Sequence, residues 1–234
     1  MIMSTSPIIV ALDHSSAHEA WALVRQLSPS LCRLKVGLHL YLRAGKTFVA
    51  ALIVEGFDVF LDLKFHDIPN TVYDACSAAA ELGVWMLTVH AQGGLGMLEA
   101  ARAGVDATSV ERHPLLVAVT MLTSLDQQQL TLLGVSEELP HVVNHCARLA
   151  VTGKMDGVVC SPNELSMLRT SLPPAFMLVT PGIRPIGCKN NDQSRVATPK
   201  QAISEGSDFL VIGRPITQSP DPLAALKTLV DSVS

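Results

Sequence analysis

The chain carries eight short runs of apolar residues, separated by stretches in which apolar residues recur with helical spacing. Most runs are rich in Val, Ile and Leu without strict alternation, which is typical of strands buried on both faces of a parallel sheet. The runs cover residues 8–13, 31–38, 58–65, 86–91, 115–122, 157–161, 176–180 and 209–213. Helical spacing is clearest at residues 16–27, 71–82, 94–103, 139–151, 163–171 and 199–205.

This alternation of strands and helices predicts βα units. Eight units in 234 residues fit one compact (β/α)8 TIM barrel, with eight parallel strands, that spans residues 1–234 as a single domain. A doubly wound open sheet is the alternative, and the number of units favours the barrel. Residues 125–140 are the least regular part of the pattern. The polar segment 185–195, PIGCKNNDQSR, is long for a compact domain and is expected to be a ligand lid.

Composition and charge argue against several classes of protein. The net charge is −4 and no cluster of Lys and Arg is present, so a nucleic-acid-binding surface is not expected. No apolar stretch approaches the roughly 18 residues of a membrane span, and the first residues lack a basic signal-peptide segment. The five cysteines show no C-x-x-C spacing, which indicates reduced, mostly buried thiols. We therefore expect a cytoplasmic protein.

Charged residues gather at the carboxyl ends of the predicted strands, where barrels of this type form active sites. Asp62 and Lys64 are two residues apart in the third strand, so both side chains are expected to point into the barrel. Because buried charges are costly unless paired, Lys35 and Asp67 are natural further members of an alternating array. A structural ion-pair layer would also explain a lone Asp-x-Lys pair. The polar residues at several other strand ends favour an active site.

Two arginines follow the last two predicted strands. Arg184 lies in TPGIRP after the seventh strand, and Arg214 lies in VIGRP after the eighth. Barrels commonly bind phosphate at this place, with loop amides and the amino end of a short helix. Gly213 lets the backbone approach an anion closely, and an arginine fork can bind two phosphate oxygens. A phosphorylated ligand is therefore expected.

Four further residues have two possible interpretations each. Asp13 is placed to accept hydrogen bonds from sugar hydroxyls or to cap the following helix. Thr123 is placed to bond a heterocycle or to cap the next helix. His141 and His145 lie one helical turn apart, which suits a metal, but without a third ligand nearby a solvated helix face is favoured. No metal site is predicted.

These motifs resemble those of the orotidine 5′-monophosphate decarboxylase family. The run DLKFHDIPNT, residues 62–71, resembles the D-x-K-x-x-D-I-x-x-T motif of that family. The segments ALD, LKVG, TVHA, LTS, TPGIRP, NDQ and VIGRP are also similar in order and spacing, over nearly the whole chain. The resemblance implies a homodimer of barrels that converts orotidine 5′-monophosphate to uridine 5′-monophosphate without a cofactor. This is the last step of de novo pyrimidine nucleotide synthesis.

The resemblance also implies a role for each site residue. Lys64 is implied to protonate C6 of the pyrimidine after carbon dioxide leaves, and Asp62 to lie beside the substrate carboxylate. Lys35 and Asp67 are implied to complete the charged array. Three residues are implied to reach into the neighbouring subunit's site: Asp67, Ile68 and Thr71. The remaining contacts are implied to be with ribose (Asp13), with the base (Thr123) and with phosphate (Arg184, Gln193, Gly213 and Arg214).

Two other functions fit parts of the pattern. A metal-dependent sugar-phosphate decarboxylase or aldolase of related barrel type shares the D-x-K-x-x-D strand. It uses an acidic metal ligand on the second strand, where this chain has Lys35, which would repel a divalent cation. A non-catalytic phosphosugar-binding barrel would need the two arginines and Gly213, but not the charged array of the third strand.

Overall fold

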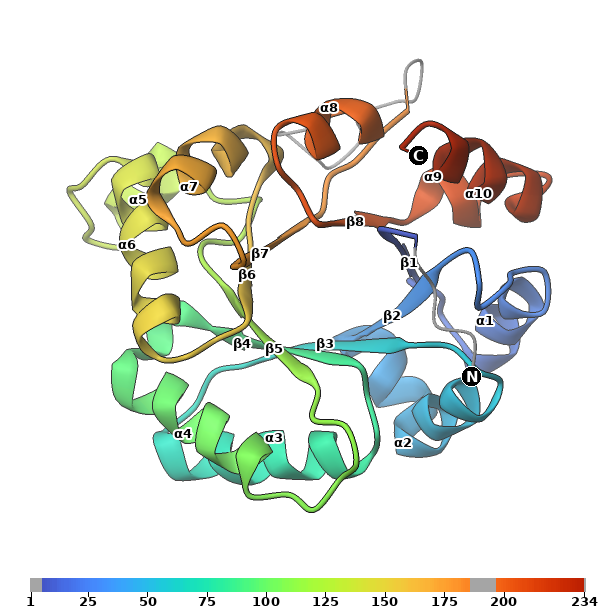
Figure 1. Ribbon diagram of the computed structural model, residues 1–234, viewed down its shortest axis with the longest axis horizontal. Helices are drawn as coiled ribbons and strands as arrows, with labels where there is room; N and C mark the ends of the chain where they lie inside the picture. Colours follow the sequence, from blue (N-terminus) through green and yellow to red (C-terminus); the bar gives the residue numbers. More distant parts are fainter. Residues whose placement is uncertain (1–5, 186–196, 234) are drawn as a thin grey trace.

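The computed structural model describes residues 6–185 and 197–233, in which eight strands form a closed barrel in the order β1 to β8. Neighbouring strands are parallel, and β8 closes the barrel by pairing with β1. The strands are β1 (Ile8–Ala11), β2 (Arg33–Gly37), β3 (Val59–Phe65), β4 (Met86–His90), β5 (Leu115–Val119), β6 (Gly157–Val159), β7 (Met177–Thr180) and β8 (Phe209–Ile212). Figure 1 shows them around a common centre with the helices outside. The predicted (β/α)8 barrel is therefore confirmed, and the open sheet is excluded.

The connections between the strands are helical. They comprise α1 (Ala17–Val24), α2 (Leu38–Val54), α3 (Pro69–Glu81), α4 (Leu95–Asp106), α5 (Gln127–Leu132), α6 (Leu139–Thr152), α7 (Leu165–Ser171) and α8 (Pro199–Ser204), with α9 (Arg214–Thr217) and α10 (Pro222–Asp231) after β8. Short 3-10 helices precede α4 and α7, at Ala91–Gly93 and Pro162–Glu164. Helices α3, α8 and α10 begin with a proline, whose missing N–H costs no hydrogen bond in the first turn.

The expected elements agree with the structure to within a few residues at their ends. The helical spacing did not reveal α2, which is interrupted at Gly45, where φ is 67° and the backbone is not helical. It also left out α9 and α10. The irregular stretch 125–140 contains the short helix α5 and the first residues of α6. The kink of α2 and the four-residue length of α9 break the periodicity on which such predictions depend.

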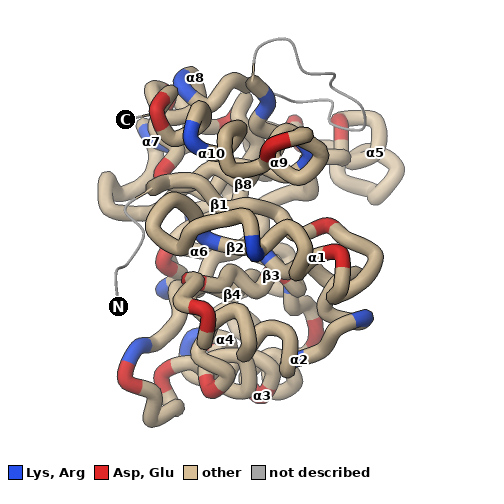
Figure 2. The backbone as a smooth tube through the Cα atoms, turned by 90° about the vertical axis from the view of Figure 1, so that its right-hand side faces the viewer, with Lys and Arg blue, Asp and Glu red and all other residues tan. Residues whose placement is uncertain are grey.

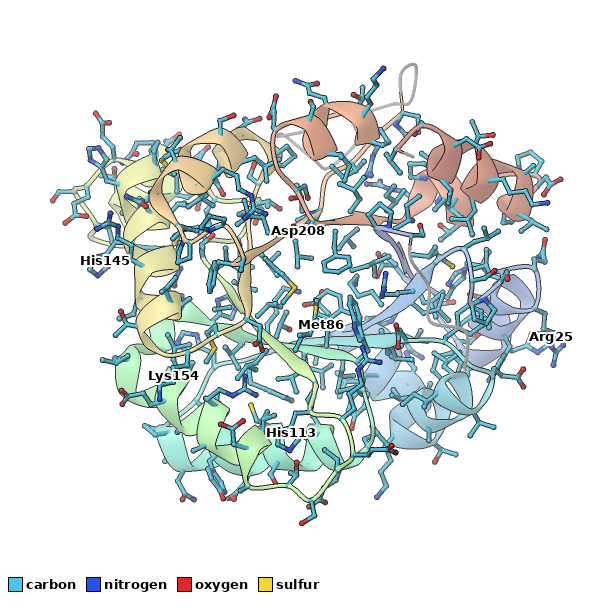
Figure 3. The ribbon with its side chains drawn as sticks, in the orientation of Figure 1. Arg25, Met86, His113, His145, Lys154 and Asp208 are labelled. Carbon is cyan, nitrogen blue, oxygen red and sulfur yellow. The ribbon has the colours of Figure 1, made fainter. Side chains whose placement is uncertain are left out.

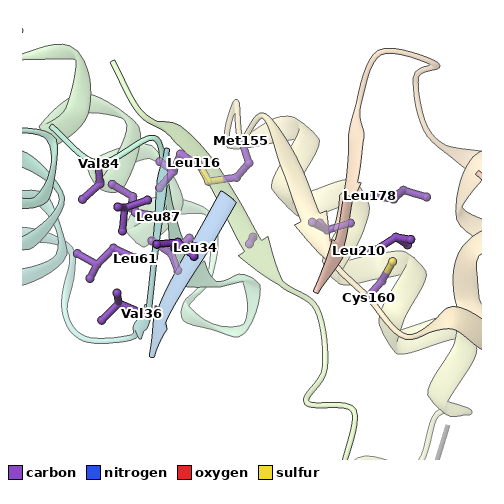
Figure 4. Close-up of a cluster of buried hydrophobic side chains, with 14 of the residues drawn as sticks. Leu34, Val36, Leu61, Val84, Leu87, Leu116, Met155, Cys160, Leu178 and Leu210 are labelled. Atoms are coloured by element: carbon purple, nitrogen blue, oxygen red, sulfur yellow. The ribbon is translucent and has the colours of Figure 1, made fainter. Parts of the chain in front are cut away.

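Alternation of side chains along each strand separates two apolar cores. Outward-facing residues such as Leu34, Leu87 and Leu116 are fully buried against the helices, and Figure 4 shows part of this cluster. Inward-facing residues such as Phe60 and Met86 fill the barrel, and Met86 lies near the middle of the ring of strands in Figure 3. The barrel is therefore a packed core and not a channel.

Arg33 closes the amino-terminal end of the barrel. Its guanidinium carbon lies 4.4 Å from the ring centroid of Trp85 and 5.2 Å from that of Phe209, and its Nε is 3.3 Å from a carboxylate oxygen of Asp58. The residue is only 7% exposed, so its charge needs this anion and these aromatic faces in place of water. The cavity of the barrel opens at the other end, where the carboxyl ends of the strands lie.

The outer surface carries mixed charge. Lys and Arg positions lie among Asp and Glu positions on the side of the molecule shown in Figure 2. His141 and His145 are exposed on α6, and His145 points outward in Figure 3, in agreement with a solvated helix face. Within residues 6–185 and 197–233, no helix combines the length and the apolar character needed to cross a lipid bilayer.

Helices α3 and α4 pack closely because α4 has a glycine at the contact. A Cβ on Gly104 would lie 2.3 Å from the backbone oxygen of Tyr73 in α3, whereas one on Gly96 of the same helix would meet nothing within 4 Å. We expect Gly104→Ala to lower the free energy of unfolding by about 1–3 kcal/mol, because the backbone of α3 would have to move. Gly96→Ala should raise it by up to about 1 kcal/mol through helix propensity.

Urea unfolding followed by circular dichroism measures both variants. Equal stabilities of Gly104→Ala and Gly96→Ala would show that α3 and α4 do not approach each other this closely.

Candidate active site

A cavity of about 440 Å³ lies at the carboxyl ends of the strands. It is within the size range of small-molecule sites. The residues predicted from the sequence that line it are Asp13, Lys35, Asp62, Lys64, Thr123, Arg184, Gly213 and Arg214. Apolar residues of β1, β3, β5, β6 and β8 form its floor. The barrel therefore gathers residues that are distant in sequence into one site.

Four charged side chains of alternating sign form a row along one wall of this cavity. The ammonium nitrogen of Lys64 is 2.8 Å from Oδ1 of Asp62, and that of Lys35 is 3.4 Å from Oδ2 of the same carboxylate. Lys35 also lies 3.4 Å from Oδ1 of Asp13. Asp13 was expected to contact a sugar or to cap a helix, so its ion pair with Lys35 was not predicted. Each ammonium thus faces at least one carboxylate.

Asp62 is the buried centre of this row. Burial by itself would raise the pKa of its carboxyl, but the ammonium groups of Lys35 and Lys64 and a hydrogen bond from Thr88 hold the pKa below its usual value. Its side chain is 11% exposed, whereas that of Lys64 is 35% exposed and faces the open cavity. Asp62 is therefore ionised at neutral pH, although little water reaches it.

The backbone of Lys64 departs from a regular strand. Its φ is 54°, in the left-handed region, and the pairing of β3 with β4 shifts register between Leu61 and Phe65. The side chains of Asp62 and Lys64 both face the cavity, as predicted. Simple two-residue alternation is not the reason, because the strand is bulged at this point. Bulges of this kind re-aim side chains near functional sites.

Two residues that support the row were not identified from the sequence. Thr88 of β4 accepts the backbone N–H of Lys64 at 2.9 Å and donates its hydroxyl to Oδ1 of Asp62 at 3.1 Å. A Cβ on Gly37 would lie 3.1 Å from the ammonium of Lys35, so a glycine leaves room for that group. The sequence could have revealed both residues, because residues two apart in a strand face the same side. Thr88 follows the inward-facing Met86 by two residues, and Gly37 follows Lys35 by two.

The two arginines follow β7 and β8, and β8 pairs with β1, which precedes Asp13 of the row. Arg184 is 9% exposed and donates a hydrogen bond to the backbone oxygen of Ile183 at 2.9 Å. Arg214 is the first residue of the short helix α9, directly after Gly213. A Cβ on Gly213 would make only ordinary contacts, at 3.7 Å from Ala11 and Asp13, so packing within the chain does not require glycine there. This position of Gly213 beside the cavity fits a close approach by a ligand.

The alternative cap roles of Asp13 and Thr123 are wrong. Ser16 caps α1 by accepting the N–H of Glu19, and Asp126 caps α5 by accepting the N–H of Gln129. Asp13 and Thr123 line the cavity instead.

Three predicted residues lie outside the cavity of their own chain. Asp67, Ile68 and Thr71 are exposed, and Ile68 reaches 68%. Oδ1 of Asp67 accepts the backbone N–H of Ile68 at 2.7 Å. The expectation that Asp67 extends the charged row is therefore not met within one chain. Gln193, and all but the first residue of the expected lid at 185–195, lie outside the described residues.

Two histidines stand next to the row. The rings of His66 and His90 are stacked with centroids 5.2 Å apart. Burial, with the nearby His66 and Lys64, lowers the pKa of His90 to about 4, so this ring is neutral at neutral pH. Among the residues described by the structure, no group of three or more His, Cys, Asp or Glu is placed to hold a metal ion.

Comparison with known protein sequences identifies one family. The sequence model of the Orotidine 5'-phosphate decarboxylase / HUMPS family matches residues 6–229. The orotidine 5'-phosphate decarboxylase of Nitrosococcus oceani is 50% identical over 232 residues, which is 99% of each chain. That of Dichelobacter nodosus is 51% identical over 228 residues, covering 97% of this chain and 99% of the relative.

A solved structure agrees with these sequence matches. The crystal structure of orotidine 5'-phosphate decarboxylase from Lactobacillus acidophilus superposes with a TM-score of 0.89 and 38% identity, over 98% of this chain and 99% of that one. On these grounds, and as its motifs predicted, the chain belongs to the orotidine 5'-phosphate decarboxylase / HUMPS family.

Proposed function

We propose that this chain removes carbon dioxide from orotidine 5′-monophosphate and releases uridine 5′-monophosphate. The observation that carries the proposal is the ionised carboxylate of Asp62, held at 2.8 Å from the ammonium of Lys64 on the cavity wall. The names of relatives that are half identical over nearly their whole length support the same reaction.

The reaction requires a place for negative charge at C6 of the pyrimidine. When the bond between C6 and the carboxylate breaks, the electron pair remains on C6 and carbon dioxide leaves. In the proposed mechanism the ammonium of Lys64 stabilises this pair and then transfers a proton to C6, which leaves a neutral amine. Because Asp62 already fixes the ammonium, little reorganisation is needed during the reaction.

Asp62 has two effects in this mechanism. It orients Lys64, and its negative charge lies beside the position proposed for the substrate carboxylate. Repulsion between the two carboxylates is relieved when neutral carbon dioxide leaves. Lys35 contacts Asp62 and Asp13 and keeps this part of the row neutralised.

The other proposed contacts bind parts of the nucleotide that lie far from the reacting carbon. We assign Asp13 to the ribose hydroxyls and Thr123 to the base. The phosphate is assigned to four residues: Arg184, Gly213, Arg214 and Gln193. Binding energy at the phosphate can then contribute to orienting the pyrimidine over Lys64 and to closing the loop at 185–195.

We further infer a homodimer in which Asp67, Ile68 and Thr71 reach the neighbouring cavity. In the proposed dimer the neighbouring subunit covers the side chain of Ile68, which is 68% exposed in the single chain. A hollow of about 410 Å³, lined by Lys35, Lys64 and the start of α2, lies beside the charged row and offers space for such a segment. We also infer a cytoplasmic location, supported by free, buried thiols at Cys32, Cys76, Cys146 and Cys160.

The rival metal-dependent reaction on a sugar phosphate is disfavoured by β2. This strand supplies the ammonium of Lys35 at the position where that reaction needs an acidic metal ligand. A phosphosugar-binding barrel without catalysis would not explain the buried Asp62 between two ammonium groups.

The proposed reaction can be tested directly with the purified protein. Orotidine 5′-monophosphate is added with an excess of EDTA, and formation of uridine 5′-monophosphate is followed by absorbance and chromatography. We expect conversion at an undiminished rate, because the proposed mechanism involves no metal. Activity that disappears with EDTA and returns with a divalent cation would favour the metal-dependent rival.

The roles of Lys64 and Asp67 lead to a complementation test. Lys64→Ala should lower kcat/KM at least about a thousandfold, since it removes the proton donor and its charge. Asp67→Ala should also lower it, through the neighbouring site. Co-expression of the two variants should restore about a quarter of the wild-type activity, because half of the dimers are mixed and each has one intact site.

Turnover and binding of uridine 5′-monophosphate are measured for each variant and for the mixture. Appreciable turnover by folded Lys64→Ala would remove Lys64 as the proton donor. No recovery in a mixture shown to contain mixed dimers would place Asp67 in its own subunit's site.

The phosphate assignment predicts a difference between two ligands. Arg214→Ala should weaken uridine 5′-monophosphate by about tenfold to a hundredfold, because it removes a charge-assisted hydrogen bond. Uridine should bind almost as before. Arg25→Ala, on the outer surface, is the matched control and should leave both affinities unchanged. Calorimetry measures the affinities, and equal losses for nucleotide and nucleoside would remove Arg214 from the phosphate site.

A further inference from the structure

Thr88 is a residue of β4 that lies opposite the bulge in β3. It is fully buried and has an inward position in β4. The strand pairing runs from Leu61 opposite Leu87 to Phe65 opposite Val89. Residues 62–64 of β3 therefore lie opposite Thr88 alone. A regular ladder of backbone hydrogen bonds is not possible across such a stretch.

The hydroxyl of Thr88 forms hydrogen bonds with both charged residues of this bulge, Asp62 and Lys64. A threonine hydroxyl has one hydrogen to donate and lone pairs that accept. Its oxygen accepts the backbone N–H of Lys64 at 2.9 Å, and its hydrogen is donated to Oδ1 of Asp62 at 3.1 Å. Oδ1 of Asp62 is also the oxygen that the ammonium of Lys64 contacts. One hydroxyl thus joins the backbone of Lys64 to its carboxylate partner.

Lys64 needs such support because its backbone is in the left-handed region. Among the described residues, only Lys64 and Lys154 have a positive φ without being glycine. Lys154 lies in a turn after α6, where its N–H bonds to the backbone oxygen of Val151. Lys64 lies within a strand, and its N–H bonds to a side chain. Conformations of this kind persist only when their surroundings hold them in place.

We propose that Thr88 is a positioning residue for the reaction, which holds the carboxylate of Asp62 and the strained backbone of Lys64 in register. It does not touch the substrate, because it lies beneath these residues and does not line the cavity. This inference depends on the proposed decarboxylation. The same hydrogen bond contributes to the low pKa of Asp62.

Substitutions at position 88 separate the hydroxyl from the volume of the side chain. Thr88→Val keeps the shape without the hydroxyl, and Thr88→Ser keeps the hydroxyl. Thr88→Ala removes the hydroxyl without placing a methyl beside Asp62, and it serves if valine prevents folding. Thr120→Val is the matched control, because Thr120 is equally buried and bonds to the backbone oxygen of Val159, away from the charged row.

We expect Thr88→Val and Thr88→Ala to lower kcat by about tenfold to a hundredfold, as for loss of a hydrogen bond to a charged group, with a small change in KM. Thr88→Ser should retain most of kcat. Thr120→Val should lose stability comparably but keep kcat. A crystal structure of Thr88→Val should show Lys64 out of the left-handed region or its contact with Asp62 broken.

Two results would overturn the inference. One is a kcat in folded Thr88→Val or Thr88→Ala within about twofold of wild type, and the other is an equal loss in Thr88→Ser. The wild type is assayed in parallel, so an inactive wild type would reject the proposed reaction. The crystal structure of Thr88→Val tests the positioning role even if the wild type is inactive. An unchanged Lys64 backbone and an unchanged contact with Asp62 would reject that role.

Discussion

The buried carboxylate of Asp62 is the constraint on which the rest of this site depends. A carboxylate taken out of water at neutral pH would bind a proton unless cations lay beside it. Lys35 and Lys64 supply these cations on either side. The two ammonium groups depend on the carboxylate in turn, since they would repel each other without the negative charge between them. Removal of any one group leaves an uncompensated charge in the barrel mouth.

Strand β3, which carries this carboxylate, does not pair regularly with β4. The bulge in β3 and the positive φ of Lys64 both oppose stability, the latter by about 1–2 kcal/mol for a residue with a side chain. The buried hydroxyl of Thr88 and the ion pairs offset part of this cost. Strain lies next to the ammonium proposed to donate the proton, whereas at the other end of the barrel Arg33 packs between Trp85 and Phe209 and pairs with Asp58.

The closed barrel distributes the residues of the proposed nucleotide site around one cavity. The charged row lies on β1, β2 and β3, whereas Arg184 and Arg214 follow β7 and β8. In a closed ring of eight strands, β7 lies across the cavity from β3. In the proposed binding mode, the phosphate near Arg184 and the reacting carbon near Lys64 therefore lie on different walls of the cavity. Energy gained at the phosphate can orient the pyrimidine without any contact to the carbon that reacts.

The sequence by itself determined the barrel, because eight apolar runs alternate with helical stretches, and it also determined which residues stand at the strand ends. It placed Asp62, Lys64 and Lys35 in one site through periodicity and motif resemblance. The tertiary structure alone decided that Asp13 joins the row and that Thr88 connects Asp62 to the backbone of Lys64. The reason is physical: periodicity specifies which face a side chain occupies, whereas a bulge, a hydrogen bond between strands and a charge contact depend on the register of neighbouring strands.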